Sequence, residues 1–169
     1  VAILGENGSG KTTLLNHILG LLKPVEGQVS VFDKDPVKSN REVVKQIGVV
    51  FQNVDEQIIG PTVYDDIAFA PLNHSYSPGE VGAMVEEVSQ QLGIGHLLDK
   101  IPHYLSGGQK KKVALAGAMV LKPRLLILDE PFNGLDPASK DEITRLLNQI
   151  NNHYDTSILV TSHDINRLA

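Results

Sequence analysis

The chain contains no cysteine, so it can form neither a disulfide nor a metal site built on thiolates, and this fits a reducing compartment. It also lacks an excess of positive charge, because 15 Lys and Arg against 20 Asp and Glu give a net charge of -5. This balance disfavours a general electrostatic grip on nucleic acid, although a local basic patch remains compatible with it. No apolar run approaches the roughly 20 residues that span a bilayer, and no signal-peptide pattern is present. The remaining composition is that of an ordinary soluble globular domain.

The length of 169 residues suits one domain with a real core, or a core with a small subdomain. The first residues, "VAILG", have the pattern of a buried strand and no initiator methionine. We therefore expect a fragment of a longer protein that lacks at least its N-terminal strands and a C-terminal segment.

Apolar runs and helical periodicity alternate along the chain. Strands are predicted at residues 1–4, 28–32, 47–52, 125–130 and 157–162, and helices at residues 12–22, 78–92, 107–121 and from Pro137 onward. This alternation predicts an α/β fold with a mainly parallel sheet and right-handed crossovers. The helical middle, residues 61–121, is predicted to be a subdomain inserted between the core segments 1–60 and 122–169.

The sequence "GENGSGKTT", residues 5–13, matches the phosphate-loop pattern between a predicted strand and a predicted helix. Backbone N–H groups and the helix N-terminus at such a loop favour a phosphate. Lys11 is expected at the β- and γ-phosphates, the Thr12 hydroxyl at Mg²⁺ and Thr13 at the α-phosphate. The alternative, a glycine-rich turn that only caps a helix, is disfavoured by the strand–helix placement. The predicted nucleotide-binding residues are Gly5, Glu6, Asn7, Gly8, Ser9, Gly10, Lys11, Thr12 and Thr13.

Two carboxylates end the apolar run "LLILDE", residues 125–130. Asp129 is expected to hold Mg²⁺ through a water molecule, and Glu130 to polarise a water for attack on the γ-phosphate. Alone, such a run is more often a strand with a solvated loop, but the phosphate loop favours the metal role. Gln52 ends another strand and is expected at Mg²⁺ or the attacking water; its alternative is a surface-loop residue. His163 is expected at the γ-phosphate, with a structural role as its alternative.

A second glycine turn, "LSGGQ" at residues 105–109, precedes a predicted helix. The Ser106 hydroxyl, the N–H groups of Gly107 and Gly108 and the helix dipole can converge on one anion. The alternative is a plain helix N-cap. Asp136 is expected to cap the helix that begins at Pro137, and the lysines at 110–112 are compatible with a solvated face.

Six motifs, "GENGSGKTT", "FQN", "LSGGQ", "LLILDEP", "GLDP" and "TSHD", stand in the order found in ATP-binding-cassette (ABC) ATPases, which the chain resembles over essentially its whole length. The resemblance implies a P-loop core with an inserted helical subdomain, ATP and Mg²⁺ as ligands, and a head-to-tail dimer. In such a dimer Ser106, Gly107, Gly108 and Gln109 cap the γ-phosphate held by the other cassette, and Asp136 belongs to a loop that crosses the interface. The adenine-stacking residue of the family normally lies upstream of the phosphate loop, so none is assigned.

The stretches "VFQNVDEQIIGPTVYDDIAFAPLN" and "HYLSGGQKKKVALAGAMVLKP" resemble the ATPases of cobalt/nickel importers and of energy-coupling-factor (ECF) vitamin importers. This implies ATP hydrolysis at the cytoplasmic face of a membrane, with a membrane subunit docked near Asp55–Asp66 and no nucleic-acid partner. A soluble cassette acting on ribosomes or DNA is the alternative. Soluble cassettes that act in chromosome maintenance are interrupted by a long coiled coil, and the ordinary interval between Gln52 and Leu105 argues against them. Cassettes associated with translation are typically more basic, and the acidic charge of this chain argues against them. A regulatory module without turnover is disfavoured by the intact site residues.

Overall fold

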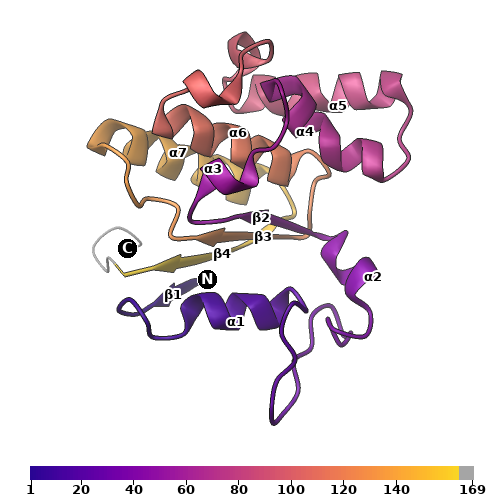
Figure 1. Ribbon diagram of the computed structural model, residues 1–169, viewed down its shortest axis with the longest axis vertical. Helices are drawn as coiled ribbons and strands as arrows, with labels where there is room; N and C mark the ends of the chain where they lie inside the picture. Colours follow the sequence, from indigo (N-terminus) through magenta and orange to yellow (C-terminus); the bar gives the residue numbers. More distant parts are fainter. Residues whose placement is uncertain (164–169) are drawn as a thin grey trace.

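The computed structural model describes residues 1–163, and its centre is a four-stranded sheet (Figure 1). The strands lie in the order β1-β4-β3-β2, with bounds β1 Ala2–Leu4, β2 Ile47–Val50, β3 Leu125–Asp129 and β4 Ser157–Ser162. All three pairings are parallel, as predicted. The carboxyl ends of the strands therefore meet at one edge of the sheet, where ligands bind in α/β proteins.

Helices cover both faces of the sheet (Figure 1). Helix α1, Lys11–Ile18, lies on one face, and α2, Asn40–Val44, flanks the same side near β2. The other face carries α3 Val54–Gln57, α4 Val63–Asn73, α5 Pro78–Gln91, α6 Gly107–Met119 and α7 Pro137–His153, with 3₁₀ turns at Gly95–Leu97 and Pro102–Tyr104. A separate hydrophobic cluster fills the space on each side of the sheet.

The predicted helix starts are confirmed where the chain supplies local caps. Asp136 accepts a hydrogen bond from the Ser139 N–H and caps α7, whose buried residues follow the i, i+3, i+4, i+7 spacing of an amphipathic helix. Ser77 caps α5 in a reciprocal pair with Glu80. Helix α6 is buried on most sides because it packs against α3, α4, α5, α7 and β2. This packing holds the start of α6, at Gly107, in a fixed position relative to the sheet.

The predicted strand at residues 28–32 is wrong. Val31 and Lys34 exchange backbone hydrogen bonds in a tight turn, and Phe32 and Asp33 have positive φ angles of 52° and 61°. The residues of this stretch have high β propensity, but they do not pair with any strand of the described sheet. A β propensity leads to a strand only where a neighbouring strand is available for pairing. The helix predicted at residues 12–22 also ends early. Gly20, with φ 68°, turns the chain, and its N–H bonds the His17 carbonyl.

Strand β1 was predicted to be fully buried, but it lies at an edge of the described sheet. Val1 is 91% exposed and Leu4 is 44% exposed, because β1 pairs with β4 alone among the described residues. The predicted helical subdomain shares one continuous apolar core with the sheet, in which Val50 and Leu128 pack together with the residues of α4, α5 and α6. Its division from the core at residues 61 and 121 stays a prediction.

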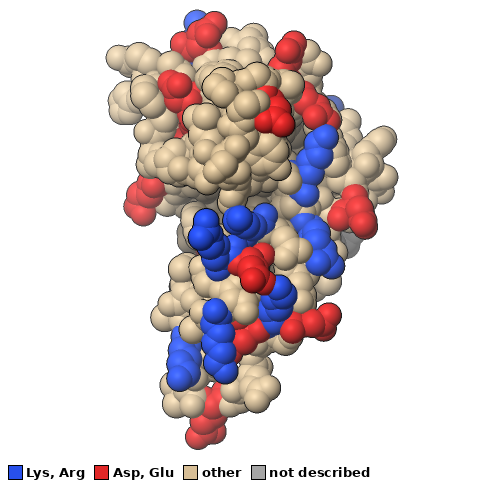
Figure 2. All heavy atoms as spheres, turned by 90° about the vertical axis from the view of Figure 1, so that its right-hand side faces the viewer, with Lys and Arg blue, Asp and Glu red and all other residues tan. Residues whose placement is uncertain are grey.

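Lys and Arg side chains gather on the face that carries α2 (Figure 2). The Arg124 guanidinium lies 4.4 Å from the centre of the Phe32 ring and donates a hydrogen bond to Gln46 Oε1 at 3.0 Å. Lys45 borders a hollow of about 410 Å³ that reaches α4 and α6 and includes Phe51. Figure 2 shows these basic side chains with acidic side chains among them, and Lys34 and Lys38 pair with Glu42 and Asp35.

Candidate functional site

The loop between β1 and α1 has the backbone shape of an anion cradle. Gly8 and Gly10 have φ angles of 82° and 92°, which L side chains rarely adopt. A Cβ built at either position would meet nothing within 4 Å, so the backbone conformation, and not crowding, requires glycine there. Among the described residues no side chain caps α1. The first N–H groups of this helix therefore lie at the loop without a side-chain acceptor.

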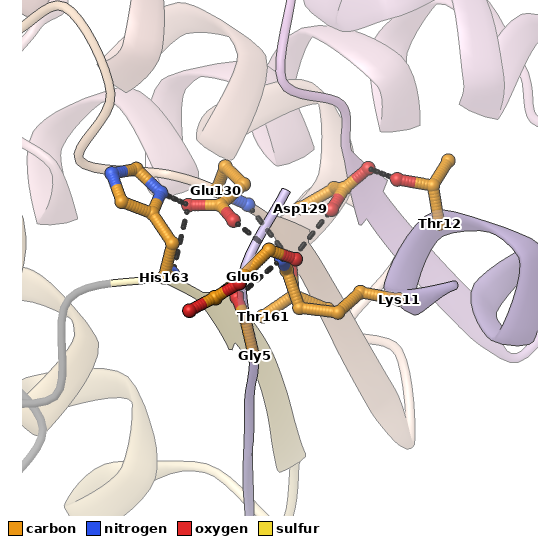
Figure 3. Close-up of polar contacts among 8 residues, drawn as sticks. All are labelled: Gly5, Glu6, Lys11, Thr12, Asp129, Glu130, Thr161 and His163. Atoms are coloured by element: carbon orange, nitrogen blue, oxygen red, sulfur yellow. Dashed lines mark hydrogen bonds and ion pairs between the residues drawn. The ribbon is translucent and has the colours of Figure 1, made fainter. Parts of the chain in front are cut away.

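Lys11 joins this loop to the end of β3 (Figure 3). Its side chain is buried, and Nζ donates to the carbonyl oxygens of Gly5 and Glu6 at 2.7 and 3.0 Å. The same Nζ lies 3.2 Å from Glu130 Oε1. The fold thus brings together a lysine and a glutamate that are 119 residues apart in the sequence.

Asp129 accepts a hydrogen bond on each carboxylate oxygen. Thr12 Oγ1 donates to Oδ2 at 3.0 Å, and Thr161 Oγ1 donates to Oδ1 at 2.6 Å. Thr161 also accepts the Glu130 N–H at 3.0 Å, so one hydroxyl fixes both acidic residues. Sequence reasoning missed Thr161. The signal in the sequence was a hydroxyl residue within the apolar strand "SILVTS". The structure shows that this hydroxyl is fully buried and lies directly opposite Asp129 in the sheet register.

Glu130 is buried and has a φ angle of 47°, a costly conformation for a residue other than glycine. His163 Nδ1 lies 2.8 Å from Glu130 Oε2 and must be the donor, because a carboxylate only accepts. Glu130 Oε1 accepts no hydrogen bond from the described residues, and the Lys11 ammonium is its neighbour. His163 and Glu130, both predicted site residues, therefore lie in contact (Figure 3).

Gln52 follows β2 at the same edge of the sheet. Its side chain is exposed and makes no hydrogen bond with Asp129 or Glu130 among the described contacts, so the structure does not join it to the acidic pair. Its backbone carbonyl instead accepts a hydrogen bond from Lys111 Nζ at 2.9 Å. Sequence reasoning missed this contact.

The lysines at 110–112 do not form a solvated face, and that interpretation is wrong. Lys111 and Lys112 are only 5% and 8% exposed. Lys110 pairs with Asp55 on α3 at 2.6 Å, and Lys112 pairs with Glu142 on α7 through a single 2.9 Å contact. The three side chains bind neighbouring elements because α6 lies in the middle of the helical layer.

Ser106 caps α6 in a reciprocal pair with Gln109. The Gln109 N–H donates to Ser106 Oγ at 3.3 Å, and the Ser106 N–H donates to Gln109 Oε1 at 2.9 Å. The N-cap interpretation is therefore confirmed, and it does not exclude anion binding. Ser106 and Gly107 are exposed, whereas Gly108 is buried where a Cβ would meet Ser139 Oγ at 2.6 Å. Helices α6 and α1 lie on opposite faces of the sheet (Figure 1), and none of the described hydrogen bonds joins this turn to the phosphate loop.

Asp136 caps α7 close to this turn. Ser139 donates its N–H and its hydroxyl to the two carboxylate oxygens, at 3.0 and 2.5 Å. The hydroxyl contact and then the N–H contact hold the pKa of Asp136 below its ordinary value. Asp136 is exposed, so the predicted cap and an interface role are compatible.

The chain is similar to proteins of known family. The family model described as "ABC transporter" matches residues 1–133, which is more than half of the chain. This chain belongs to the ABC transporter ATPase family. Members of this ABC ATPase family hydrolyse ATP. A second family model, described as "AAA domain, putative AbiEii toxin, Type IV TA system", matches residues 99–169.

Several curated ABC proteins are similar over the whole chain. The energy-coupling factor transporter ATP-binding protein EcfA of Methanoculleus marisnigri is 43% identical, over 100% of this chain and 61% of that protein. EcfA of Methanocaldococcus jannaschii is 44% identical, over 98% of this chain and 60% of that protein. An ABC transporter ATP-binding protein of Methanosarcina mazei is 49% identical, over 98% of this chain and 37% of that protein. The chain thus spans about three-fifths or less of the length of these relatives.

Solved ABC structures have the same fold. The cbiO1 protein of Clostridium perfringens, part of the cbiONQ ABC transporter complex, superposes with a TM-score of 0.90 at 40% identity, covering 99% of this chain and 68% of that one. A bacterial ABC transporter cassette solved as a dimer gives a TM-score of 0.83 at 31% identity, covering 98% of this chain and 75% of that one. Within residues 1–163, no helix is long and apolar enough to cross a membrane.

The side chains at the sheet edge suit the Mg²⁺ that accompanies ATP in such proteins. Thr12 and Asp129 present hard oxygen donors 3.0 Å apart, and magnesium prefers oxygen ligands. The described part of the chain contains no group of three or more His, Asp or Glu that could hold a metal ion. Mg²⁺ is commonly held by one or two protein ligands together with substrate phosphates.

Proposed function

We propose that this ABC ATPase domain binds ATP with Mg²⁺ and hydrolyses it at the edge of the sheet. The observation that carries the proposal is the contact of Glu130 with both Lys11 and His163, beside an Asp129 carboxylate held by Thr12. These contacts support the proposal because a lysine that would bind phosphate, a carboxylate that would hold the metal and a carboxylate that would act as general base lie together.

Glu130 is assigned to the attacking water. Its Oε2 is bonded to His163, so Oε1, which accepts no hydrogen bond from the described residues, is the oxygen that accepts a proton from water. Lys11 exchanges its contacts with Glu130 and the loop carbonyls for the β- and γ-phosphates. Water oxygen then bonds to the γ-phosphorus as the bond to ADP breaks. His163 is also assigned to the γ-phosphate.

The remaining predicted residues are assigned to the nucleotide and its metal. Thr12, Asp129 and Gln52 would hold Mg²⁺, which would neutralise the charge that develops on the phosphate oxygens. Asp129 is suited to this role because the hydroxyls of Thr161 and Thr12 donate hydrogen bonds to its carboxylate and orient it. The other nucleotide contacts come from the phosphate loop: Gly5, Glu6, Asn7, Gly8, Ser9, Gly10 and Thr13.

The experiment replaces the general base alone. Glu130→Gln should lower the ATP turnover rate by about 10²- to 10⁴-fold, the usual contribution of a general base. ATP affinity should change little, because the phosphate loop and Lys11 are intact. Turnover is measured by phosphate release and affinity by a fluorescent ATP analogue. An unchanged turnover rate would remove Glu130 from this role.

We further propose that the glycine turn completes the site of a second cassette. Ser106, Gly107 and Gln109 are accessible at the start of α6, on the face of the sheet away from their own phosphate loop, as this requires. Gly108 belongs to the same turn, and the exposed Asp136 is assigned to the interface. The dimeric cassette among the similar structures supports the arrangement. Glu130→Gln protein with ATP should elute as a dimer, and Ser106→Arg in that background should return it to the monomer.

The transport role is proposed from the printed names of the relatives, which describe ECF transporters and a cbiONQ complex. The chain would be a peripheral subunit at the cytoplasmic face of a membrane and would drive import of cobalt or nickel ions or a vitamin. It would dimerise with an identical or a related cassette.

The membrane subunit is proposed to dock near Asp55–Asp66. Asp66 accepts the N–H groups of Ile59 and Gly60 at 2.8 and 3.0 Å, and Asp65 closes the cap of α4 with Thr62. Charge reversal at Asp65 or Asp66 would therefore disturb the loop itself. Ile59 is the better probe because its side chain is 65% exposed beside a hollow of about 240 Å³.

The docking test compares Ile59→Asp with Val25→Asp in the full-length protein. Val25 is a fully exposed apolar residue outside the proposed docking segment. Ile59→Asp should reduce co-purification with an integral membrane protein, and Val25→Asp should not. Recovery of the wild type with ribosomes or DNA would favour the soluble alternative.

A further inference from the structure

Lys111 is a buried cation that the proposed hydrolysis does not use. Its side chain is 5% exposed, and Nζ donates to the backbone carbonyls of Gln52 at 2.9 Å and Phe51 at 3.3 Å. The two carbonyls belong to the turn that follows β2, whereas Lys111 lies in the second turn of α6. The contact therefore joins two elements at the catalytic edge of the sheet.

An ammonium group at this position is costly. Burial lowers the pKa of Lys111 to about 8, with the charge of Asp129 acting in the opposite direction. Lys110 and Lys112 have carboxylate partners, but among the described contacts Lys111 is held by neutral carbonyl groups. An apolar side chain would avoid the desolvation cost at this site. Compared with an apolar side chain, the lysine provides the hydrogen bonds to the carbonyls of Phe51 and Gln52.

The Gln52 turn has described hydrogen bonds on both sides of it: Gln57 holds the residues before Gln52, and Asn53 caps α3 directly after it. Among the described residues, Lys111 is the donor that reaches the carbonyls of Phe51 and Gln52 themselves. Phe51 donates its N–H to Gln57 Oε1 at 2.9 Å, and Gln57 Nε2 donates to the Val49 carbonyl at 2.8 Å. These bonds fix the start of the turn. The Lys111 bond fixes its end, at the residue whose side chain is proposed to reach Mg²⁺ or water.

We propose that Lys111 is a positioning residue that sets the backbone of Gln52 and ties it to the helix that begins at Ser106. The Ser106 end of α6 and the Gln52 turn then move together, so contact of a second cassette with the glycine turn also fixes Gln52. The link between Lys111 and the turn concerns only this chain's own contacts. Its consequence for catalysis rests on the proposed function.

The test compares Lys111→Met with Lys112→Met in the full-length protein. Both variants remove a buried ammonium from the same helix, but Lys112 contacts Glu142 on α7 and not the Gln52 turn. Hydrogen exchange of a peptide covering residues 51–57, without nucleotide or metal, should speed up about ten-fold in Lys111→Met and stay unchanged in Lys112→Met. Lys111→Arg, which keeps the charge and the donors, should restore slow exchange.

The same variants are then assayed for turnover. Lys111→Met should need about ten-fold more Mg²⁺ for half-maximal ATP hydrolysis, the usual effect of losing support for a metal-binding group, with ATP affinity little changed. Equal exchange in the two methionine variants would overturn the positioning role. Fast exchange with an unchanged Mg²⁺ requirement would overturn the assignment of Gln52 to the metal and keep the link between Lys111 and the turn. Absence of hydrolysis in the wild type would count against the proposed function alone, because the exchange result does not depend on turnover.

Discussion

Replacing Thr161 with valine removes one hydroxyl that supports both acidic residues of the site. The side chain is fully buried and nearly isosteric with valine, so the change removes hydrogen bonds with little change of volume. The charge-assisted bond to Asp129 is worth about 1.5–3 kcal/mol, and the Glu130 N–H left without an acceptor costs about 1–3 kcal/mol. Burial of the additional methyl group of valine stabilises the folded state by about 0.8 kcal/mol. The free energy of unfolding should therefore fall by about 2–5 kcal/mol.

The same change should weaken metal binding. Without the Thr161 hydroxyl, Asp129 Oδ1 loses its donor, and the carboxylate is held only by the Thr12 hydrogen bond to Oδ2 among the described contacts. The Mg²⁺ concentration for half-maximal turnover should increase about 10- to 100-fold, as for other residues that orient a metal ligand. Urea denaturation measures the first effect, and a Mg²⁺ titration of ATP hydrolysis measures the second.

Two controls separate the hydroxyl from general destabilisation. Thr161→Ser keeps the hydroxyl and should keep the wild-type Mg²⁺ requirement. Thr156 is also buried and donates to the Pro123 carbonyl at 2.6 Å, directly before the start of β4 and far from the Asp129 end of the strand. Thr156→Val should cost about 1 kcal/mol and leave the Mg²⁺ requirement unchanged. If Thr161→Val matched Thr156→Val in its Mg²⁺ titration, Thr161 would not position Asp129.

Two further predictions concern the phosphate loop and α7. Lys11→Ala should weaken ATP binding at least ten-fold in a fluorescent-nucleotide titration, because the variant removes the cation that lies at the loop; wild-type affinity would refute the cradle. Asp136 has a lowered pKa in the folded chain, so its cap stabilises α7 above the ordinary value of 3.8 and is lost as the pH falls through the lowered value. The stability difference between wild type and Asp136→Asn, measured in urea, should therefore be largest near neutral pH and shrink in acid, and a constant difference would contradict this.

Local patterns were sufficient for much of the fold. The glycines of the phosphate loop are needed by backbone angles within the loop itself, and the caps at Ser77 and Asp136 act within one turn of their helices. The apolar run at 125–129 predicts a buried strand whatever its neighbours. The strand predicted at 28–32 failed because a strand also needs a partner, and β propensity says nothing about whether one is in reach.

The sequence by itself determined the phosphate loop, the capped helix starts and the acidic pair that ends the apolar run, since each depends on residues close together in the chain. The alternation of strands and helices predicted that the sheet is parallel, but the pairing of its strands joins distant residues. Only the tertiary structure decided that Glu130 lies between Lys11 and His163, that Thr161 supports Asp129 across the sheet, and that Lys111 reaches the Gln52 carbonyl. These contacts join residues between 32 and 119 positions apart. Strand register and the burial of α6 determine them, and neither is written in any short stretch of sequence.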